Sequence, residues 1–136
     1  MKRVFVDSGG FFALLAPEDQ FHGHTCALFQ QANSERWRLI TKNAVVIETH
    51  ALLLARSRGG RRNALGFLDI LANDAYHIER IRKADEGRAM ALLRGHEDKD
   101  YSLCDALSFV VMERLGIAEA IAFDRHFRAY GRFTVL

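Results

Sequence analysis

The sequence contains little cysteine and no long apolar run, and each shortage excludes a class of protein. The two cysteines, Cys26 and Cys104, form neither a CxxC motif nor a zinc-binding pattern, which favours a reducing compartment over a disulfide-stabilised secreted domain. No apolar run approaches the roughly 20 residues that a transmembrane helix needs. Lys2 and Arg3 precede an apolar stretch, as in a signal peptide, but Asp7 interrupts that stretch. We therefore expect an unprocessed cytoplasmic protein with no membrane segment.

Length and composition indicate an ordinary globular protein. The chain has 136 residues, of which 49% are hydrophobic and 26% are charged, and it shows no internal repeat, low-complexity tract or linker. A chain of this length can bury a full core in a single domain, which we expect to span residues 1–136. The net charge of +2 is too small to indicate a nucleic-acid-binding protein by itself.

Short apolar segments typical of buried β-strands alternate with helical patterns along the whole chain. The sole proline, Pro17, ends the first helical segment, which follows a turn at residues 8–10. The strand segments are residues 3–6, 38–41, 76–81, 120–123 and 133–136. The helical segments are approximately residues 11–16, 19–33, 44–57, 62–71, 84–93 and 102–115. This alternation predicts an α/β fold with a parallel sheet that helices cover on both faces.

Four acidic residues occupy positions that converge in such a fold. Asp7 and Asp124 each come directly after an apolar strand, and Glu48 and Asp105 lie near the starts of helices, on their apolar faces. In a parallel sheet the carboxyl ends of the strands and the starts of the helices share one edge, where ligands bind. Four carboxylates crowded together need a counter-charge, and Mg²⁺ or Mn²⁺ suits them best. The matching chemistry is metal-dependent hydrolysis of a phosphodiester bond.

Two of these acids also have a purely structural interpretation. Asp105 stands three residues after Ser102, which is the spacing of a capping box. In that motif the two side chains accept hydrogen bonds from free backbone amides at the start of a helix. Glu48 could simply be an acid at the border of an apolar stripe. The repetition of the same anomaly in four separate segments favours the functional interpretation.

Several segments closely resemble the PIN-domain family, in particular the VapC-like ribonuclease toxins. The resemblance covers essentially the whole chain in order, and its last two segments are the most specific. These segments are residues 4–7, 19–22, 41–49, 101–109 and 122–127. Gly131-Arg-Phe133 departs mildly from the Gly-Phe that the family has after the fourth acid, and this departure does not affect the acids.

The resemblance implies a fold, an activity and a set of partners. The fold would be a three-layer α/β/α sandwich with a central parallel sheet of about five strands. The protein would be a Mg²⁺- or Mn²⁺-dependent endoribonuclease acting on an RNA substrate, and the toxin of a type II toxin-antitoxin pair. It would form a homodimer and bind a cognate antitoxin protein. The metal-binding and catalytic acids would be Asp7, Glu48, Asp105 and Asp124.

Other side chains are candidates for binding the substrate. Ser102 matches a hydroxyl position of the family motif, and Asp100 is a fifth acid that could hold metal-bound water or substrate. Arg125 could stabilise charge in the transition state. A group of arginines, which could hold RNA phosphates or an acidic antitoxin segment, could equally form a solvated helix junction. This group is Arg56, Arg58, Arg61 and Arg62.

Two other classes of protein remain as alternatives. A non-catalytic PIN-like module would keep the fold and bind RNA or a protein, but the presence of all four acids argues against a decayed site. A phospho-acceptor receiver domain has a similar length and also places acids after strands. Such a domain carries adjacent acids after its first strand and a lysine after its last, whereas here Ser8 follows Asp7 and no lysine occurs beyond Lys99.

Overall fold

Five parallel strands form a single sheet at the centre of the protein. The structure is a computed structural model that describes all 136 residues. The strand order is β3-β2-β1-β4-β5, and every neighbouring pair is parallel. The strands are β1 (Arg3–Val6), β2 (Arg38–Lys42), β3 (Tyr76–Glu79), β4 (Glu119–Ile121) and β5 (Thr134–Val135).

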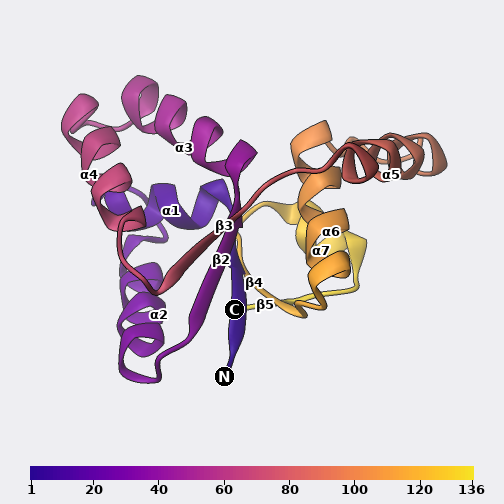
Figure 1. Cartoon of the computed structure of the whole chain (residues 1–136). Coiled ribbons are helices and arrows are strands. Elements are labelled where there is room, and N and C mark those ends of the chain that lie inside the picture. The colour runs from indigo at the N-terminus through magenta and orange to yellow at the C-terminus, as the bar shows by residue number, and fades with distance from the viewer.

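Seven helices cover the two faces of this sheet. Helices α1 to α4 lie on one face and α5 to α7 on the other, so the predicted three-layer α/β/α sandwich is confirmed (Figure 1). None of these helices has both the length and the apolarity that crossing a bilayer requires. The helices are α1 (Ser8–Leu15), α2 (His22–Ser34), α3 (Asn43–Arg56), α4 (Arg61–Leu71), α5 (Lys83–Gly95), α6 (Leu103–Leu115) and α7 (Arg125–Tyr130).

The central strand of the sheet is buried on both faces. Val4, Phe5 and Val6 of β1 have no exposed surface, as expected for a central strand that reads as a continuous apolar run. Phe109 of α6 and Phe127 of α7 pack against each other with ring centroids 5.1 Å apart. This packing fixes the helices that carry two of the predicted acids onto the same face of the sheet.

The predicted elements are present, with differences in detail that include the start of α2 at His22 and the end of β4 at Ile121. Helix α1 starts at Ser8, where a turn was expected, because the carbonyl of Asp7 accepts hydrogen bonds from the backbone of Gly10 and Phe11. Gly10 also lets α1 approach β4 closely, since a Cβ there would lie 2.8 Å from the carbonyl oxygen of Ile121. Helix α7 was not predicted, and β3 ends at Glu79 instead of residue 81.

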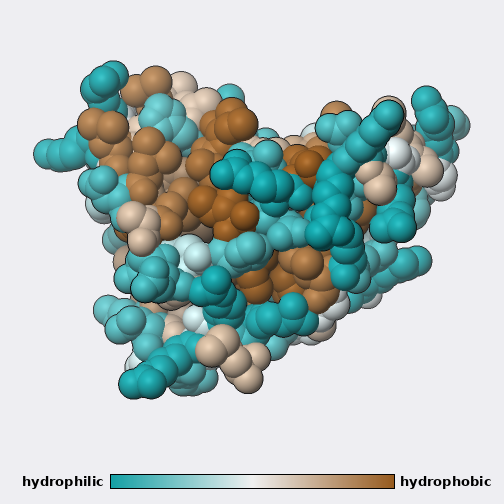
Figure 2. Space-filling model, viewed as in Figure 1, coloured by the Kyte–Doolittle hydropathy of each residue, from teal (hydrophilic) through white to brown (hydrophobic).

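The carboxyl ends of the strands open toward a hollow in the surface. In the view of Figure 2 this hollow separates the lobe formed by α3 and α4 from the lobe formed by α5 and α6. Helix α5 extends away from the sheet and packs mainly on α6 (Figure 1). An ion-pair cluster anchors it, in which Arg114 of α6 contacts Asp85 of α5 at 2.8 Å and Glu79 of β3 at 2.6 Å.

Candidate metal and active site

Three of the four predicted acids lie at the carboxyl edge of the sheet or at the start of a helix that begins there. Asp7 ends β1 and stands at the N-cap of α1, and Asp124 follows β4 at the N-cap of α7. Asp105 is the third residue of α6. Glu48 is half-buried in the second turn of α3. The pairing of β1 with β4 therefore places Asp7 and Asp124, which are more than 100 positions apart in the chain, at the same edge of the sheet.

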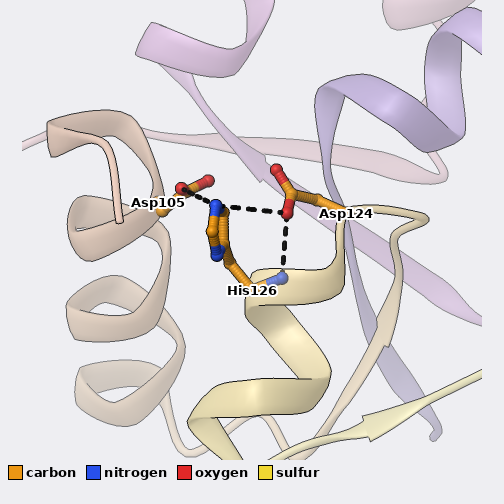
Figure 3. Close-up of side chains that lie close together, drawn as sticks. All are labelled: Asp105, Asp124 and His126. Carbon is orange, nitrogen blue, oxygen red and sulfur yellow. Dashed lines mark hydrogen bonds and ion pairs between the residues drawn. The ribbon is translucent and has the colours of Figure 1, made fainter. Parts of the chain in front are cut away.

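The closest group consists of Asp105, Asp124 and His126. One ligand atom from each of the three lies within 4.8 Å of the others. Figure 3 shows the imidazole of His126 between the two carboxylates, with Nε2 at 3.9 Å from Oδ2 of Asp105 and at 3.8 Å from Oδ1 of Asp124. Neither Asp7 nor Glu48 belongs to this close group.

The geometry of this group excludes direct hydrogen bonds between the three side chains and is compatible with ion pairing or with a shared divalent cation. Separations of 3.8 and 3.9 Å are too long for hydrogen bonds. Two atoms that bind one ion with bonds of about 2.1 Å can be up to about 4.2 Å apart, so both His126 separations are compatible with a shared ion. The three atoms as a group lie within 4.8 Å of one another, so a single ion would draw the two carboxylates slightly closer together. Two carboxylates and an imidazole are ligands that suit Mn²⁺, and carboxylates with water suit Mg²⁺. These residues could therefore hold a divalent metal with positions left open for water and substrate.

The first turn of each helix orients the two carboxylates. The backbone amide of Ser102 donates to Oδ2 of Asp105 at 2.9 Å, and the amide of Asp105 donates to Oγ of Ser102 at 3.0 Å. The amide of His126 donates to Oδ1 of Asp124 at 2.8 Å. The capping box considered from the sequence is therefore present. Oδ2 of Asp105 accepts its hydrogen bond and also faces His126, and Oδ1 accepts no hydrogen bond and is available to a ligand.

The charges of Glu48 and of Asp105 in the close group act on Asp7, although Asp7 and Glu48 are not members of that group. The pKa of Asp7 is raised to about 7, mainly by burial. The charge of Lys42 acts to lower this pKa, and the charges of Glu48 and Asp105 act to raise it. Burial also raises the pKa of Asp105, and the charge of Asp124 adds to this shift. Carboxylates whose ionised forms are disfavoured in this way are stabilised by a bound cation.

Lys42 is a cation that the sequence reasoning missed. Its side chain is fully buried at the end of β2, and Nζ donates a hydrogen bond to Sγ of Cys104 at 3.0 Å. Burial raises the pKa of Cys104 to about 11, so the thiol is neutral and accepts this hydrogen bond. The available signal was its position, because Lys42 ends β2 at the same edge where Asp7 follows β1.

The weaker candidates lie at the edge of the site or farther away. Asp100 and Arg125 form an exposed ion pair of 2.8 Å, and Oδ1 of Asp100 lies 4.0 Å from Nδ1 of His126. Arg58 and Arg62 line a separate pocket with Glu18, and Arg61 is exposed at the start of α4. Only Arg56 of this group lines a pocket together with Asp124.

Comparison with known proteins identifies the family. The PIN domain family model matches residues 4–132. The 23S rRNA-specific endonuclease VapC20 of Mycobacterium tuberculosis, in strains H37Rv and CDC 1551, is 34% identical over 128 residues, which cover 94% of both chains.

Solved structures agree with this assignment. The crystal structure of Mycobacterium tuberculosis VapC20, described as a sarcin-ricin loop cleaving toxin, superimposes with a TM-score of 0.84 at 32% identity and covers 97% of this chain and 98% of that one. VapBC2 from Rickettsia felis, bound to a DNA fragment from their promoter, has a TM-score of 0.68 at 9% identity, covers 98% and 97%, and supports the fold alone. The chain belongs to the PIN-domain family.

Proposed function

We propose that the protein is a Mg²⁺- or Mn²⁺-dependent endoribonuclease that hydrolyses RNA phosphodiester bonds as the toxin of a toxin-antitoxin pair. The observation that carries this proposal is the convergence of Asp105, Asp124 and His126 within 4.8 Å at the carboxyl edge of the sheet. It occurs in a chain that is 34% identical to a 23S rRNA-specific endonuclease over 94% of both lengths. We propose that residues 1–136 act as one nuclease domain.

The acids have the role of holding the ion and orienting the substrate. Asp7, Glu48, Asp105 and Asp124 would bind the metal directly or through water, and His126 would supply a nitrogen ligand. A bound divalent metal lowers the pKa of water and stabilises charge on a phosphate. The hydrogen bonds that fix Asp105 and Asp124 pre-orient both carboxylates, so little order is lost when the substrate binds.

Basic side chains offset the negative charge that a phosphate would otherwise meet. Lys42 reduces the repulsion around Asp7 from inside the protein. Arg125 is exposed beside Asp100 and can turn toward a phosphate oxygen at the entrance of the site. An exposed ion pair of this kind is weak, so exchanging it for a phosphate contact costs little.

The names of the relatives support a proposal for the substrate and the partners. VapC20 is named for cleavage of 23S rRNA and of the sarcin-ricin loop. We propose a structured loop of ribosomal RNA as the substrate, with the protein acting in the cytoplasm. The Rickettsia felis neighbour is named as VapBC2 bound to a DNA fragment from their promoter. We propose that an antitoxin protein neutralises this chain and that the chain forms a homodimer.

Cleavage of a defined RNA panel tests the proposal. Wild-type protein should cut at least one structured RNA with Mg²⁺ or Mn²⁺ and should lose that activity with excess chelator. Asp105→Asn should lower the rate by more than about 100-fold, because removal of even an outer-shell partner of a metal ligand costs 10- to 100-fold. Asparagine can still accept the hydrogen bond from Ser102, so helix α6 should keep its cap.

Asp74→Asn is a matched control for this variant. Asp74 is exposed just before β3, at the opposite edge of the sheet, and the change removes the same charge. Full activity should remain in this control. RNA binding without cleavage by the wild-type protein, with either metal, would instead support a non-catalytic PIN-like module.

A further inference from the structure

A pocket of about 310 Å³ lies directly beside the proposed metal site. Asp124 is one of its lining residues, and Ser8 and Gly9 of α1 form part of its wall. The remaining lining includes both apolar and charged residues, namely Phe12, Phe21, Leu52, Phe123 and Arg56. None of these features is used by the metal chemistry described above, although the pocket shares a carboxylate with it.

An exposed aromatic ring forms one side of this pocket. The side chain of Phe21 is 38% exposed, although phenylalanine is among the residues most often buried in proteins. Its ring stacks on that of Phe123, with centroids 4.4 Å apart and planes inclined by 5°. Because Phe123 covers one face of Phe21, the surface that Phe21 offers to the pocket is its other face or its edge. Phe123 is the residue immediately before Asp124 in the sequence.

The position of Phe21 is fixed by its neighbours. The backbone amide of Phe21 donates to Oδ2 of Asp19 at 2.9 Å, in a turn that precedes α2. The rings of His24 and Phe123 pack in a T-shaped arrangement with centroids 6.1 Å apart. A ring that is already stacked on one face can stack with its other face on a planar ligand without losing much side-chain entropy.

The charges around the pocket suit a nucleotide. Arg56 is exposed at the end of α3 and takes part in none of the ion pairs of the protein. It is therefore free to contact a phosphate. Asp19 also lines the pocket and can accept a hydrogen bond from the amino group of a base. A flat apolar surface, a free guanidinium and an acceptor together match the base, the phosphate and the base edge of one nucleotide.

We propose that this pocket, the Phe21 pocket, binds the base of a nucleotide adjacent to the scissile phosphate of the RNA substrate. Phe21 stacks on that base, and Arg56 contacts the neighbouring phosphate. This inference rests on the proposed nuclease function, because the acids define where the scissile phosphate lies. Phe21 would then be a residue that sets which nucleotide is accepted next to the cleavage site.

A double-mutant cycle between the protein and the RNA tests this role. The substrate is the shortest structured RNA that the wild-type protein cleaves, with its cleavage site mapped, and with an abasic nucleotide placed at each flanking position in turn. At one position the abasic RNA should lower kcat/KM of the wild-type protein by about 5- to 150-fold, the range expected for loss of one base-aromatic stack. Phe21→Leu should cause a loss of similar size on the intact RNA.

The two changes should not add if they remove the same contact. Phe21→Leu should therefore cleave the abasic RNA no more slowly than it cleaves the intact RNA. Phe21→Trp should retain most of the activity, because tryptophan also presents an aromatic face. Met90→Leu alters a similarly exposed apolar side chain on α5 and should change neither kcat/KM nor the effect of the abasic nucleotide.

The outcomes separate this inference from the proposed function. If the wild-type protein cleaves RNA but the two losses multiply, or if Phe21→Leu is fully active, the Phe21 pocket does not bind a base while the nuclease function stands. If Phe21→Leu keeps full activity but escapes neutralisation by the antitoxin, the pocket binds a protein side chain instead. If the wild-type protein cleaves no RNA with either metal, both the nuclease function and the pocket assignment are wrong.

Discussion

Nε2 of His126 lies 3.9 Å from Oδ2 of Asp105, although the two residues belong to different helices and are joined only through the packing of α6 and α7. The same nitrogen lies 3.8 Å from Oδ1 of Asp124. An imidazole in this position would add a nitrogen ligand to an otherwise oxygen-rich metal site. Such a ligand favours Mn²⁺ over Mg²⁺.

We therefore predict that His126→Gln weakens Mn²⁺ binding more than Mg²⁺ binding. The loss for Mn²⁺ should be at least about 10-fold, comparable to the effect of changing a residue that supports a metal ligand. Calorimetric titration or electron paramagnetic resonance of Mn²⁺ measures this directly, without requiring activity. His77→Gln, at an exposed position of β3, is the control. Equal losses for the two metals would show that His126 is not a ligand.

The buried carboxyl group of Asp7 should make the metal-free protein less stable as the pH rises. Burial raises its pKa to about 7 from an ordinary value of 3.8, so the folded state holds a proton that the unfolded state has already released. Stability is therefore lost progressively between about pH 4 and pH 7 and is constant above that range.

Asp7→Asn should remove this effect. In chelator at pH 8 the variant should have a higher free energy of unfolding than the wild-type protein, by a few kcal/mol and on the order of 4 at most. The difference should become small near pH 4, and it should narrow at pH 8 when Mn²⁺ is added, because the ion stabilises the wild-type protein. Urea unfolding at both pH values measures it. A less stable Asp7→Asn variant in chelator at pH 8 would contradict this account.

Arg114 should be required for stability at neutral pH. Its guanidinium donates two hydrogen bonds to the fully buried carboxylate of Asp85 and a third to Glu79, and its own side chain is only 13% exposed. Arg114→Met leaves Asp85 buried without its partner. This loss should lower the free energy of unfolding by about 3–5 kcal/mol. Arg132→Met breaks an ion pair that is 67% exposed on the arginine side and should cost at most about 1 kcal/mol.

The effect of Arg114 should depend on pH. Burial acts to raise the pKa of Asp85, but the hydrogen bonds from Arg114 and from the backbone of Arg82 outweigh it and hold that pKa below its usual value. Hydrogen bonds from His77 and Arg114 lower the pKa of Glu79. Because folding lowers both pKa values, the two carboxylates stabilise the folded protein at neutral pH, and this stabilisation is lost as the pH falls below about 4. The difference in free energy of unfolding between the wild-type protein and Arg114→Met should therefore decrease below about pH 4.

The apolar surface of α3 and α4 should form the homodimer interface. Ile47, Leu54, Leu65 and Leu68 are all exposed, Ile47 by 71%, and Figure 2 shows an apolar patch over these two helices. Ile47→Asp should convert a dimer to a monomer in sedimentation velocity, because a charge in the interface core is costly. Met90→Asp on α5 is the control. A wild-type monomer, or a dimer that tolerates Ile47→Asp, would exclude this face.

Much of the architecture was predictable because apolar periodicity is a local property. The run Val4 to Val6 and the apolar residues around Asp105 identified a central strand and a buried helix. Helix α7 was missed because it is only one to two turns long and is held by the cap of Asp124 and by burial of Phe127. Short helices have little intrinsic stability, so their sequences carry a weak signal.

The sequence by itself determined the alternation of strands and helices, and it indicated that four acids should gather at one edge of the sheet. Only the tertiary structure decided that Asp105 and Asp124 lie close to His126, that Asp7 and Glu48 stand outside that close group, and that buried Lys42 offsets part of the charge. The reason is physical. Periodicity and capping act between residues a few positions apart, whereas the distance between two side chains on different elements depends on how those elements pack.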